Sequence, residues 1–212
     1  MIRVECKQGT PQWKAARAGV VTASGISKIV TPGGKPSSQA DGYMNRLLAE
    51  TLLGEPIEDA GSGFMERGLG LEATAAAAYG FAHDVEPEIV GFLLRDDRRL
   101  GCSPDRLIGM AGGLEVKCPG AVQHIANLRD HDGFYADHKT QVQTQLLVSG
   151  REWWDLMSFH PRLPEVVIRA VPDPAWRKAV EPAVEAFLAR FDVELARLRP
   201  LVEASRSMNP FA

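Results

Sequence analysis

The sequence predicts a mixed α/β fold in which a central sheet is flanked by helices. Helical patterns fill the first 80 residues, the apolar spacing then changes to that of strands, and a helix, two strands and a last helix follow. The chain has 212 residues, of which 45% are hydrophobic, so it can bury one sizeable core. We therefore expect a single domain over residues 1–212.

Helices dominate the N-terminal part of the expected fold. The first helix should have Thr10 as its N-cap, Pro11 in its first helical position and Gly19 at its end. Residues 31–42 are rich in Gly, Pro and Ser, which predicts a mobile loop. The expected helices cover residues 10–19, 22–30, 41–54 and 62–80.

Strands and tight turns are expected next, with a hairpin turn at Ala111–Gly113. A final amphipathic helix should span residues 173–200, and Pro182 should kink or restart it. The expected strands cover residues 88–97, 99–110, 113–119, 152–160 and 165–171, with one more helix over 136–150.

Several functional classes are disfavoured by composition. No apolar run is long enough to span a membrane, and the N-terminus lacks a signal-peptide core, so a cytoplasmic protein is expected. Cys6, Cys102 and Cys118 form no CxxC pair, which argues against a disulfide framework and against a zinc or iron–sulfur site. None of the five histidines lies in a metal-ligand pattern.

Charge is distributed unevenly along the chain. Residues 1–40 carry six basic residues against one acid, whereas residues 41–97 carry twelve acids against three arginines. A basic N-terminal region on an acidic body is typical of a surface that binds an anion, and an ordinary patchy surface is the alternative.

Three charged residues lie among apolar and turn residues around the expected hairpin. Pairing of the two strands would bring Asp105 beside Glu115 and Lys117, which share one face of their strand because side chains alternate. Two neighbouring carboxylates repel each other unless a cation lies between them. Oxygen ligands without His or Cys suit Mg²⁺ or Mn²⁺, so a metal site is one interpretation and a structural salt bridge is the other.

A metal at this position would lower the pKa of a bound water and polarise a phosphodiester. Lys117 could then orient or deprotonate that water, or stabilise charge on the phosphate. The Glu-x-Lys pattern has little specificity by itself, because Glu5-Cys6-Lys7 also matches it. The second match gains weight from Asp105, which lies ten residues before Glu115.

The residues "SPD…GLEVKCP" resemble the catalytic core of the PD-(D/E)xK, restriction-endonuclease-like nuclease superfamily. More narrowly, the chain resembles the phage lambda exonuclease and YqaJ-type alkaline exonuclease family. The resemblance reaches from near the N-terminus to about residue 160, and residues 31–42 match nothing in the family. It rests on four ordered blocks, at Gln8–Ser24, Glu66–Glu72, Cys102–Pro119 and Gln141–Gln143.

The resemblance implies a role for each matching residue. Asp105, Glu115 and Lys117 would be catalytic, and both carboxylates would bind metal together with the backbone carbonyl of Val116. Glu72 would face the same metals from its helix; a solvent-facing acid is the alternative. The implied cofactor is a pair of Mg²⁺ ions, with Mn²⁺ as a substitute.

The resemblance also implies a pocket for the 5′-phosphate of DNA, formed by Arg17, Ser24, Ser103 and Gln141. A guanidinium binds phosphate bidentately, and N–H groups at a helix start favour an anion. Without the family, Arg17 could be a surface residue and Ser24 a simple cap. Residues 1–40 would then hold the DNA end, residues 66–160 would form the catalytic core, and residues 173–200 would add the C-terminal helix.

The implied function is a Mg²⁺-dependent 5′→3′ double-strand DNA exonuclease. It would release mononucleotides and leave 3′ single strands for a single-strand annealing protein in phage-type recombination, acting as a ring-shaped homotrimer. A PD-(D/E)xK endonuclease or resolvase would share the catalytic residues but would also cut circular DNA. A non-catalytic DNA-end-binding protein would keep Arg17 and show no metal-dependent turnover.

Overall fold

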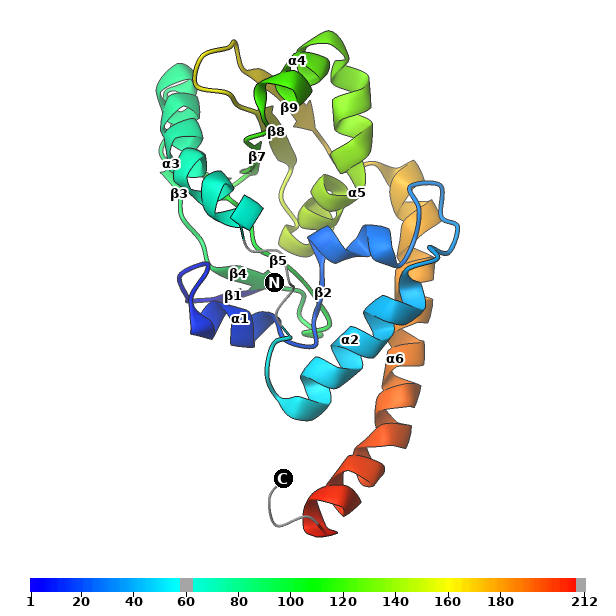
Figure 1. The fold of residues 1–212 in the computed structure, drawn as a ribbon. Helices are drawn as coiled ribbons and strands as arrows, with labels where there is room; N and C mark the ends of the chain where they lie inside the picture. Colours follow the sequence, from blue (N-terminus) through cyan, green and yellow to red (C-terminus); the bar gives the residue numbers. More distant parts are fainter. Residues whose placement is uncertain (58–62, 209–212) are drawn as a thin grey trace.

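The computed structural model describes residues 1–57 and 63–208, which form two mixed sheets surrounded by helices (Figure 1). The expected α/β class is confirmed, but the strands divide between a four-stranded sheet, β1-β4-β5-β2, and a five-stranded sheet, β3-β6-β7-β8-β9. The strands are β1 (Ile2–Val4), β2 (Val21–Thr22), β3 (Pro87–Glu88), β4 (Phe92–Leu94), β5 (Leu100–Cys102), β6 (Arg106–Ile108), β7 (Gly112–Lys117), β8 (Trp153–Ser158) and β9 (Val166–Ala170).

The predicted strand over residues 99–110 is broken into β5 and β6, which belong to different sheets. The break falls at Ser103-Pro104-Asp105, where Pro104 has no N–H with which to continue a ladder. This short segment therefore crosses from one sheet to the other, and it carries two of the predicted site residues.

The hairpin between β6 and β7 turns two residues earlier than predicted. Ile108 pairs with Gly112, so the turn covers Gly109–Ala111 rather than Ala111–Gly113. Gly112 and Gly113 lie inside β7. These positions are glycine because the rings of Trp153 and Trp154 on β8 occupy the space that a Cβ would need. Close packing against β8, rather than a turn, explains this glycine pair.

The helices largely follow the sequence pattern. Thr10 caps α1 by accepting from the Trp13 N–H, as predicted, and Gly54 ends α2 in the left-handed conformation. The predicted start of α3 at Ser62 lies outside the described residues. The helical segments are α1 (Pro11–Arg17), the 3₁₀ helix η1 (Ala23–Lys28), α2 (Ala40–Leu53), α3 (Gly63–His83), α4 (Ala121–Arg129), α5 (His131–Ser149) and α6 (Pro174–Met208).

The last helix, α6, is continuous through Pro182, so the predicted restart is wrong. Its buried stripe, Trp176, Val180, Val184 and Phe187, continues across the proline and packs into the main core. A proline removes one backbone hydrogen bond, and this packing compensates for the loss. Within the described residues, no helix is both long and apolar enough to cross a bilayer.

Residues 31–39 form a defined turn that lies against α6. Val30 and Pro36 make an antiparallel bridge, and Gly34 adopts a positive φ of 81°. A Cβ on Gly34 would lie 2.6 Å from the Ala179 carbonyl oxygen, so glycine allows the close approach. The predicted mobility of this segment stays a prediction.

Two helices cover opposite faces of the five-stranded sheet. Ala75 and Tyr79 of α3 pack in one hydrophobic cluster with Leu114 and Val116 of β7. Residues of α5 reach the other side of β7, where Glu115 and Lys117 point. The predicted alternation along this strand is confirmed, and it directs both charged side chains toward α5.

Candidate active site

The crossing segment and β7 meet at a hydrogen bond between Asp105 and Val116. The Val116 N–H donates to Asp105 Oδ2 at 2.6 Å. The Lys117 carbonyl accepts from the Phe159 N–H on the β8 side of β7. Because the backbone polar groups of successive strand residues point to opposite edges, those of Val116 point away from β8. The Val116 carbonyl therefore points to the same edge as the Asp105 carboxylate.

Glu115 is the hydrogen-bonding centre of the site, and it is only 4% exposed. Lys117 Nζ donates to its Oε1 at 2.7 Å, and Gln141 Nε2 donates to the same oxygen at 2.6 Å. Gln145 Nε2 donates to Oε2 at 2.6 Å. Lys117 Nζ also donates to Gln141 Oε1 at 3.1 Å, which closes a ring of three side chains.

The electrostatics of this group favour a cation. Burial, and then the charges of Glu115 and Glu72, raise the pKa of Asp105 well above its ordinary value, although the Val116 N–H and Lys117 oppose the shift. Burial alone would lower the pKa of Lys117, but Glu115 and Asp105 outweigh it and raise that pKa. Lys117 supplies one positive charge to the two carboxylates Asp105 and Glu115, so the group carries a net negative charge when both are ionised.

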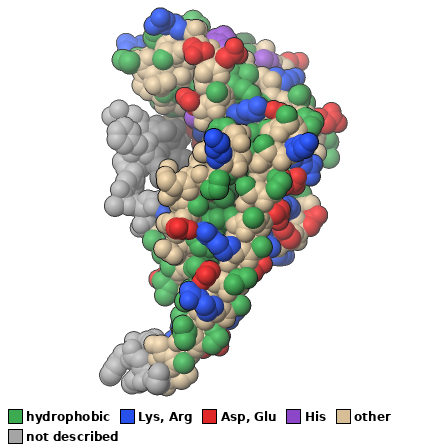
Figure 2. Space-filling view, turned by 90° about the vertical axis from the view of Figure 1, so that its right-hand side faces the viewer, with side chains coloured by type: hydrophobic (Ala, Val, Ile, Leu, Met, Phe, Trp, Pro, Cys, Tyr) green, Lys and Arg blue, Asp and Glu red, His purple; other side chains and the backbone are tan. Residues whose placement is uncertain are grey.

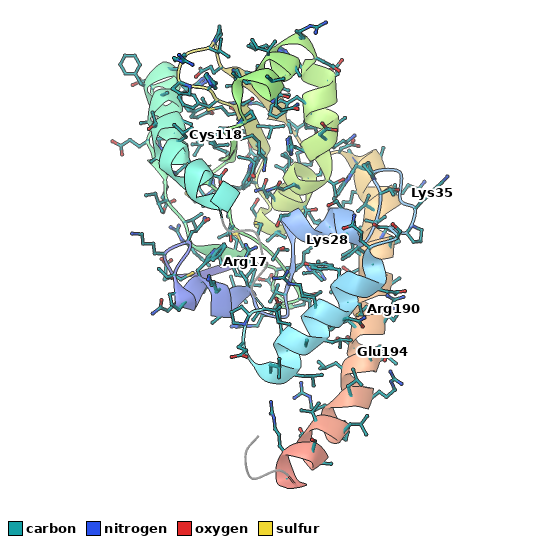
Figure 3. The ribbon with its side chains drawn as sticks, viewed as in Figure 1. Arg17, Lys28, Lys35, Cys118, Arg190 and Glu194 are labelled. Atoms are coloured by element: carbon teal, nitrogen blue, oxygen red, sulfur yellow. The ribbon has the colours of Figure 1, made fainter. Side chains whose placement is uncertain are left out.

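Glu72 lies on the α3 side of the sheet, where Arg106 Nη1 donates to Glu72 Oε1 at 2.7 Å. The same guanidinium group also donates to the Asp105 carbonyl. Glu72 therefore affects Asp105 through its charge, and its predicted role as a metal ligand stays a prediction. Cys118 is partly buried nearby (Figure 3), and burial together with Glu72 and Asp105 raises its pKa to about 11.

The remaining donor atoms fit a hard divalent cation. Among the described residues, no three His, Cys, Asp or Glu side chains converge closely enough to hold a metal. The predicted set also includes Glu72, whose carboxylate pairs with Arg106. Asp105, Glu115 and the Val116 carbonyl are the predicted donors that remain beside one another. Within the described part of the chain, Asp105 Oδ1 accepts no hydrogen bond and Glu115 Oε2 accepts one, so both keep acceptor capacity.

Of the four residues predicted to bind the 5′-phosphate, Arg17 and Ser103 meet at the Ser103 hydroxyl. Gln141 instead bonds Glu115 and Lys117, so its predicted role at the phosphate stays a prediction. Arg17 Nη1 donates to Ser103 Oγ at 2.8 Å, and Trp13 Nε1 donates to the same oxygen at 2.9 Å. The guanidinium of Arg17 also stacks over the Trp13 ring, 4.2 Å from its centroid. Trp13 is absent from the predicted site, although its i, i+4 spacing from Arg17 on α1 is a sequence signal.

Arg17 is an unusual cation in this region. Among the described residues it has no carboxylate partner, whereas Arg3 forms ion pairs with Glu5 and Glu88. Burial lowers the pKa of Arg17. A partly buried guanidinium without a carboxylate suits an incoming anion.

Ser24 is exposed, and its hydroxyl lies 3.4 Å from that of Thr22. The structure shows no contact between Ser24 and the Arg17–Ser103 pair. Ser24 and Ser103 nevertheless lie at the same end of the four-stranded sheet. Thr22 of β2 is opposite Gly101 of the parallel strand β5, and each serine follows two residues later. The role of Ser24 in phosphate binding stays a prediction.

Gln8 is a supporting residue that sequence reasoning missed. Its Nε2 donates to the Val90 carbonyl at 2.9 Å and to the Pro104 carbonyl at 2.7 Å. These bonds connect the N-terminus to the segment that carries Ser103 and Asp105. Only its place in the block Gln8–Ser24 pointed to it.

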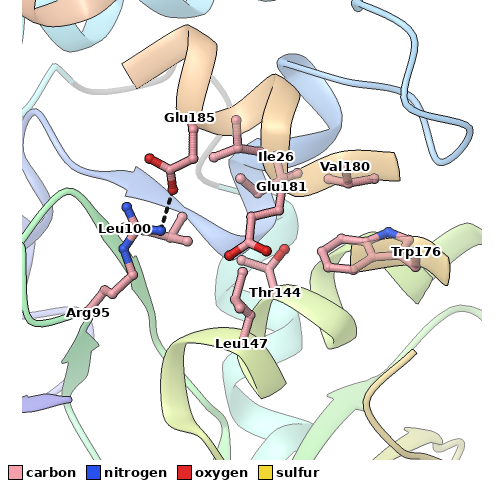
Figure 4. A pocket seen from close by; sticks show the side chains of 10 residues that line it. Ile26, Arg95, Leu100, Thr144, Leu147, Trp176, Val180, Glu181 and Glu185 are labelled. Carbon is pink, nitrogen blue, oxygen red and sulfur yellow. Dashed lines mark hydrogen bonds and ion pairs between the residues drawn. The ribbon is translucent and has the colours of Figure 1, made fainter. Parts of the chain in front are cut away.

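Other parts of the surface show less organisation. A small pocket between α5 and α6 is lined by Thr144, Trp176 and Glu181 (Figure 4), and it includes none of the site residues. The face of the molecule along α6 mixes charges of both signs (Figure 2), and ion pairs such as Arg190–Asp41, at 2.7 Å, neutralise part of them. Neither feature competes with the carboxylate site.

Comparisons with known proteins identify the family and the fold of the chain. The model of the YqaJ-like viral recombinase domain matches residues 12–152. A solved alkaline exonuclease, LHK-Exo from Laribacter hongkongensis, is 32% identical; the match covers 92% of this chain and 99% of that one, with a TM-score of 0.80. The same enzyme in complex with dAMP gives a TM-score of 0.79.

A phage-related exonuclease from Haemophilus somnus 129PT also has a similar structure. The TM-score is 0.65 over 84% of this chain and 96% of that one, at 13% identity, which supports the fold alone. The search of curated proteins finds no match.

Proposed function

This chain belongs to the YqaJ-like viral recombinase domain family, and we propose that it is a Mg²⁺-dependent double-strand DNA exonuclease. We further propose that it degrades one strand from a 5′-phosphorylated end in the 5′→3′ direction and releases mononucleotides. The alkaline exonuclease activity of the 32% identical neighbour supports the reaction class, and its complex with dAMP supports a mononucleotide product.

The observation that carries this proposal is the short path between the phosphate pocket and the carboxylates. Ser103 accepts from Arg17, and Asp105 follows only two residues later in the segment that joins the two sheets. Two residues span at most about 7 Å, a distance that one nucleotide can bridge. A terminal phosphate held by Arg17 would place the next phosphodiester at Asp105.

A divalent cation held by Asp105, Glu115 and the Val116 carbonyl would polarise the scissile phosphodiester and lower the pKa of a water bound to it. Lys117 is held in place by Glu115 and Gln141, which use two of its three N–H donors. The third N–H can orient the attacking water or donate to a phosphate oxygen as charge develops there.

The proposed direction follows from Arg17. Its guanidinium can bind a terminal phosphate bidentately, and a 5′-hydroxyl end offers no such charge. The 3′ strand that remains would suit a single-strand annealing protein, and a ring-shaped homotrimer would retain the duplex. The annealing protein and the homotrimer are both proposed from the family resemblance.

Linear and closed circular duplex DNA test the proposal together, with 5′-phosphate and 5′-hydroxyl ends compared in Mg²⁺ and in EDTA. We expect only linear DNA to be lost, faster with the phosphate, and no loss in EDTA. Cutting of the circle would replace the exonuclease by an endonuclease or resolvase. End binding without metal-dependent turnover would instead identify a non-catalytic DNA-end-binding protein.

A further inference from the structure

Three glutamines on α5 have two different functions. Gln141 and Gln145 lie one helical turn apart and both reach Glu115. Gln143 points to the other side, where its amide bonds the Val171 carbonyl and the Asp173 N–H, each at 2.8 Å. Gln143 therefore supports the fold, whereas Gln141 and Gln145 face the site.

Gln145 is fully buried, yet only half of its amide is satisfied. Its Nε2 donates to Glu115 Oε2, whereas its Oε1 has no hydrogen-bond partner within the described part of the chain. Turning the amide over would place Oε1 against a carboxylate oxygen, so the contact with Glu115 fixes this orientation. A buried unpaired carbonyl is a cost that an apolar side chain of the same size would avoid. Packing alone does not explain a glutamine here.

We propose that Gln145 is a positioning residue that fixes the carboxylate of Glu115 for metal binding. Lys117 and Gln141 both hold Glu115 Oε1, and Gln145 is the one described residue that holds Oε2. Without Gln145, the carboxylate could rotate about its last bond toward the two donors on Oε1. The oxygen that keeps acceptor capacity for a cation would then lose its fixed direction.

The test is the affinity of the metal-free protein for Mn²⁺ without DNA, measured by calorimetry for wild type, Gln145→Met and Gln143→Met. We expect Gln145→Met to bind Mn²⁺ at least about 10-fold more weakly, as for other residues that orient metal ligands. Gln143→Met removes a buried glutamine from the same helix, so it should lower thermal stability but keep Mn²⁺ affinity. Unchanged affinity in Gln145→Met, or equal losses in both variants, would overturn the proposal.

Kinetics provide a second readout. Gln145→Met should lower kcat for linear duplex DNA and leave its KM unchanged, because no DNA contact is removed. If Gln145→Met does not fold, Gln145→Asn keeps the amide but is too short to reach Oε2. The same loss of Mn²⁺ affinity is expected from it, and wild-type affinity would contradict the proposal.

This inference rests on the proposed metal site, and Asp105→Asn separates the two failures. If Asp105→Asn also binds Mn²⁺ as wild type does, the metal lies elsewhere and both proposals fail. If Asp105→Asn loses Mn²⁺ while Gln145→Met keeps it, the metal site stands and only the role of Gln145 is overturned.

Discussion

Asp105 lies immediately before β6, and its side chain extends the pairing of that strand with β7. Its Oδ2 accepts from the Val116 N–H at 2.6 Å. This bond connects the segment between the two sheets to the strand that carries Glu115 and Lys117. The geometry of the site therefore depends on the register of the β6–β7 hairpin, in which Arg106 pairs with Leu114.

Replacing Lys117 by alanine should abolish most cleavage and keep DNA binding. The variant loses the N–H that is proposed to orient the water, and we expect kcat to fall by about 10²–10⁴-fold. Single-turnover cleavage in Mg²⁺ and binding of the same duplex in Ca²⁺ measure the two properties. Turnover at the wild-type rate would remove Lys117 from the mechanism.

The metal-free protein should be less stable at higher pH because of Asp105. Burial and the charges of Glu115 and Glu72 raise its folded-state pKa, so ionising it costs more in the folded than in the unfolded chain. Asp105 begins to lower the free energy of unfolding as pH rises past the pKa of an ordinary carboxyl group. The loss grows until pH reaches the raised folded-state pKa. Asp105→Asn, which cannot ionise, should remove this loss.

Urea unfolding of wild type and Asp105→Asn in EDTA, from pH 5 upward, measures the effect. The stability difference should grow with pH in favour of the variant, and excess Mg²⁺ should reverse it by stabilising wild type alone. A difference that does not change with pH would contradict the assigned charge environment.

Arg17→Ala should reduce the preference for 5′-phosphorylated over 5′-hydroxyl ends by about 10-fold or more, because a charge-assisted bond to the phosphate is lost. The ratio of the two initial rates cancels any general loss of activity. Lys35→Ala is the matched control, since this exposed cation lies far from Arg17 (Figure 3). An unchanged ratio in Arg17→Ala would place the phosphate pocket elsewhere.

Asp155→Ala should destabilise the five-stranded sheet without changing the chemistry. The buried carboxylate of Asp155 accepts two bonds from Arg169, each at 2.8 Å, and one from the Tyr79 hydroxyl at 2.6 Å. Its loss leaves the buried Tyr79 hydroxyl without its acceptor, whereas the half-exposed Arg169 can bond water, and we expect a cost of about 1–3 kcal/mol. Chemical denaturation measures that cost, and Mn²⁺ affinity of the folded variant should match wild type. Reduced affinity would show that the two faces of the sheet are coupled.

The charged centre of the site was predictable from sequence, because strand alternation and one hairpin place Asp105, Glu115 and Lys117 together. The i, i+4 spacing of Gln141 and Gln145 likewise places them on one face of α5, away from Gln143. These features depend on local periodicity, which a sequence displays directly.

Features that depend on distant packing were not predictable. Helix α4 was missed because its polarity is reversed: His124 and Asn127 are buried and bond Ser158, whereas Val122 is 89% exposed. Apolar spacing cannot reveal a helix whose buried side is polar. The pairing of Glu72 with Arg106, 34 residues apart, likewise has no local signal.

The most direct test of the central claim is the order in which the ends of a linear duplex are released in Mg²⁺. One strand would carry a labelled 5′-terminal nucleotide and the other a labelled 3′-terminal nucleotide. We predict that the 5′ label appears first, as a mononucleotide, while the 3′ label stays in long strands. Early release of the 3′ label, or of labelled oligonucleotides, would contradict the account.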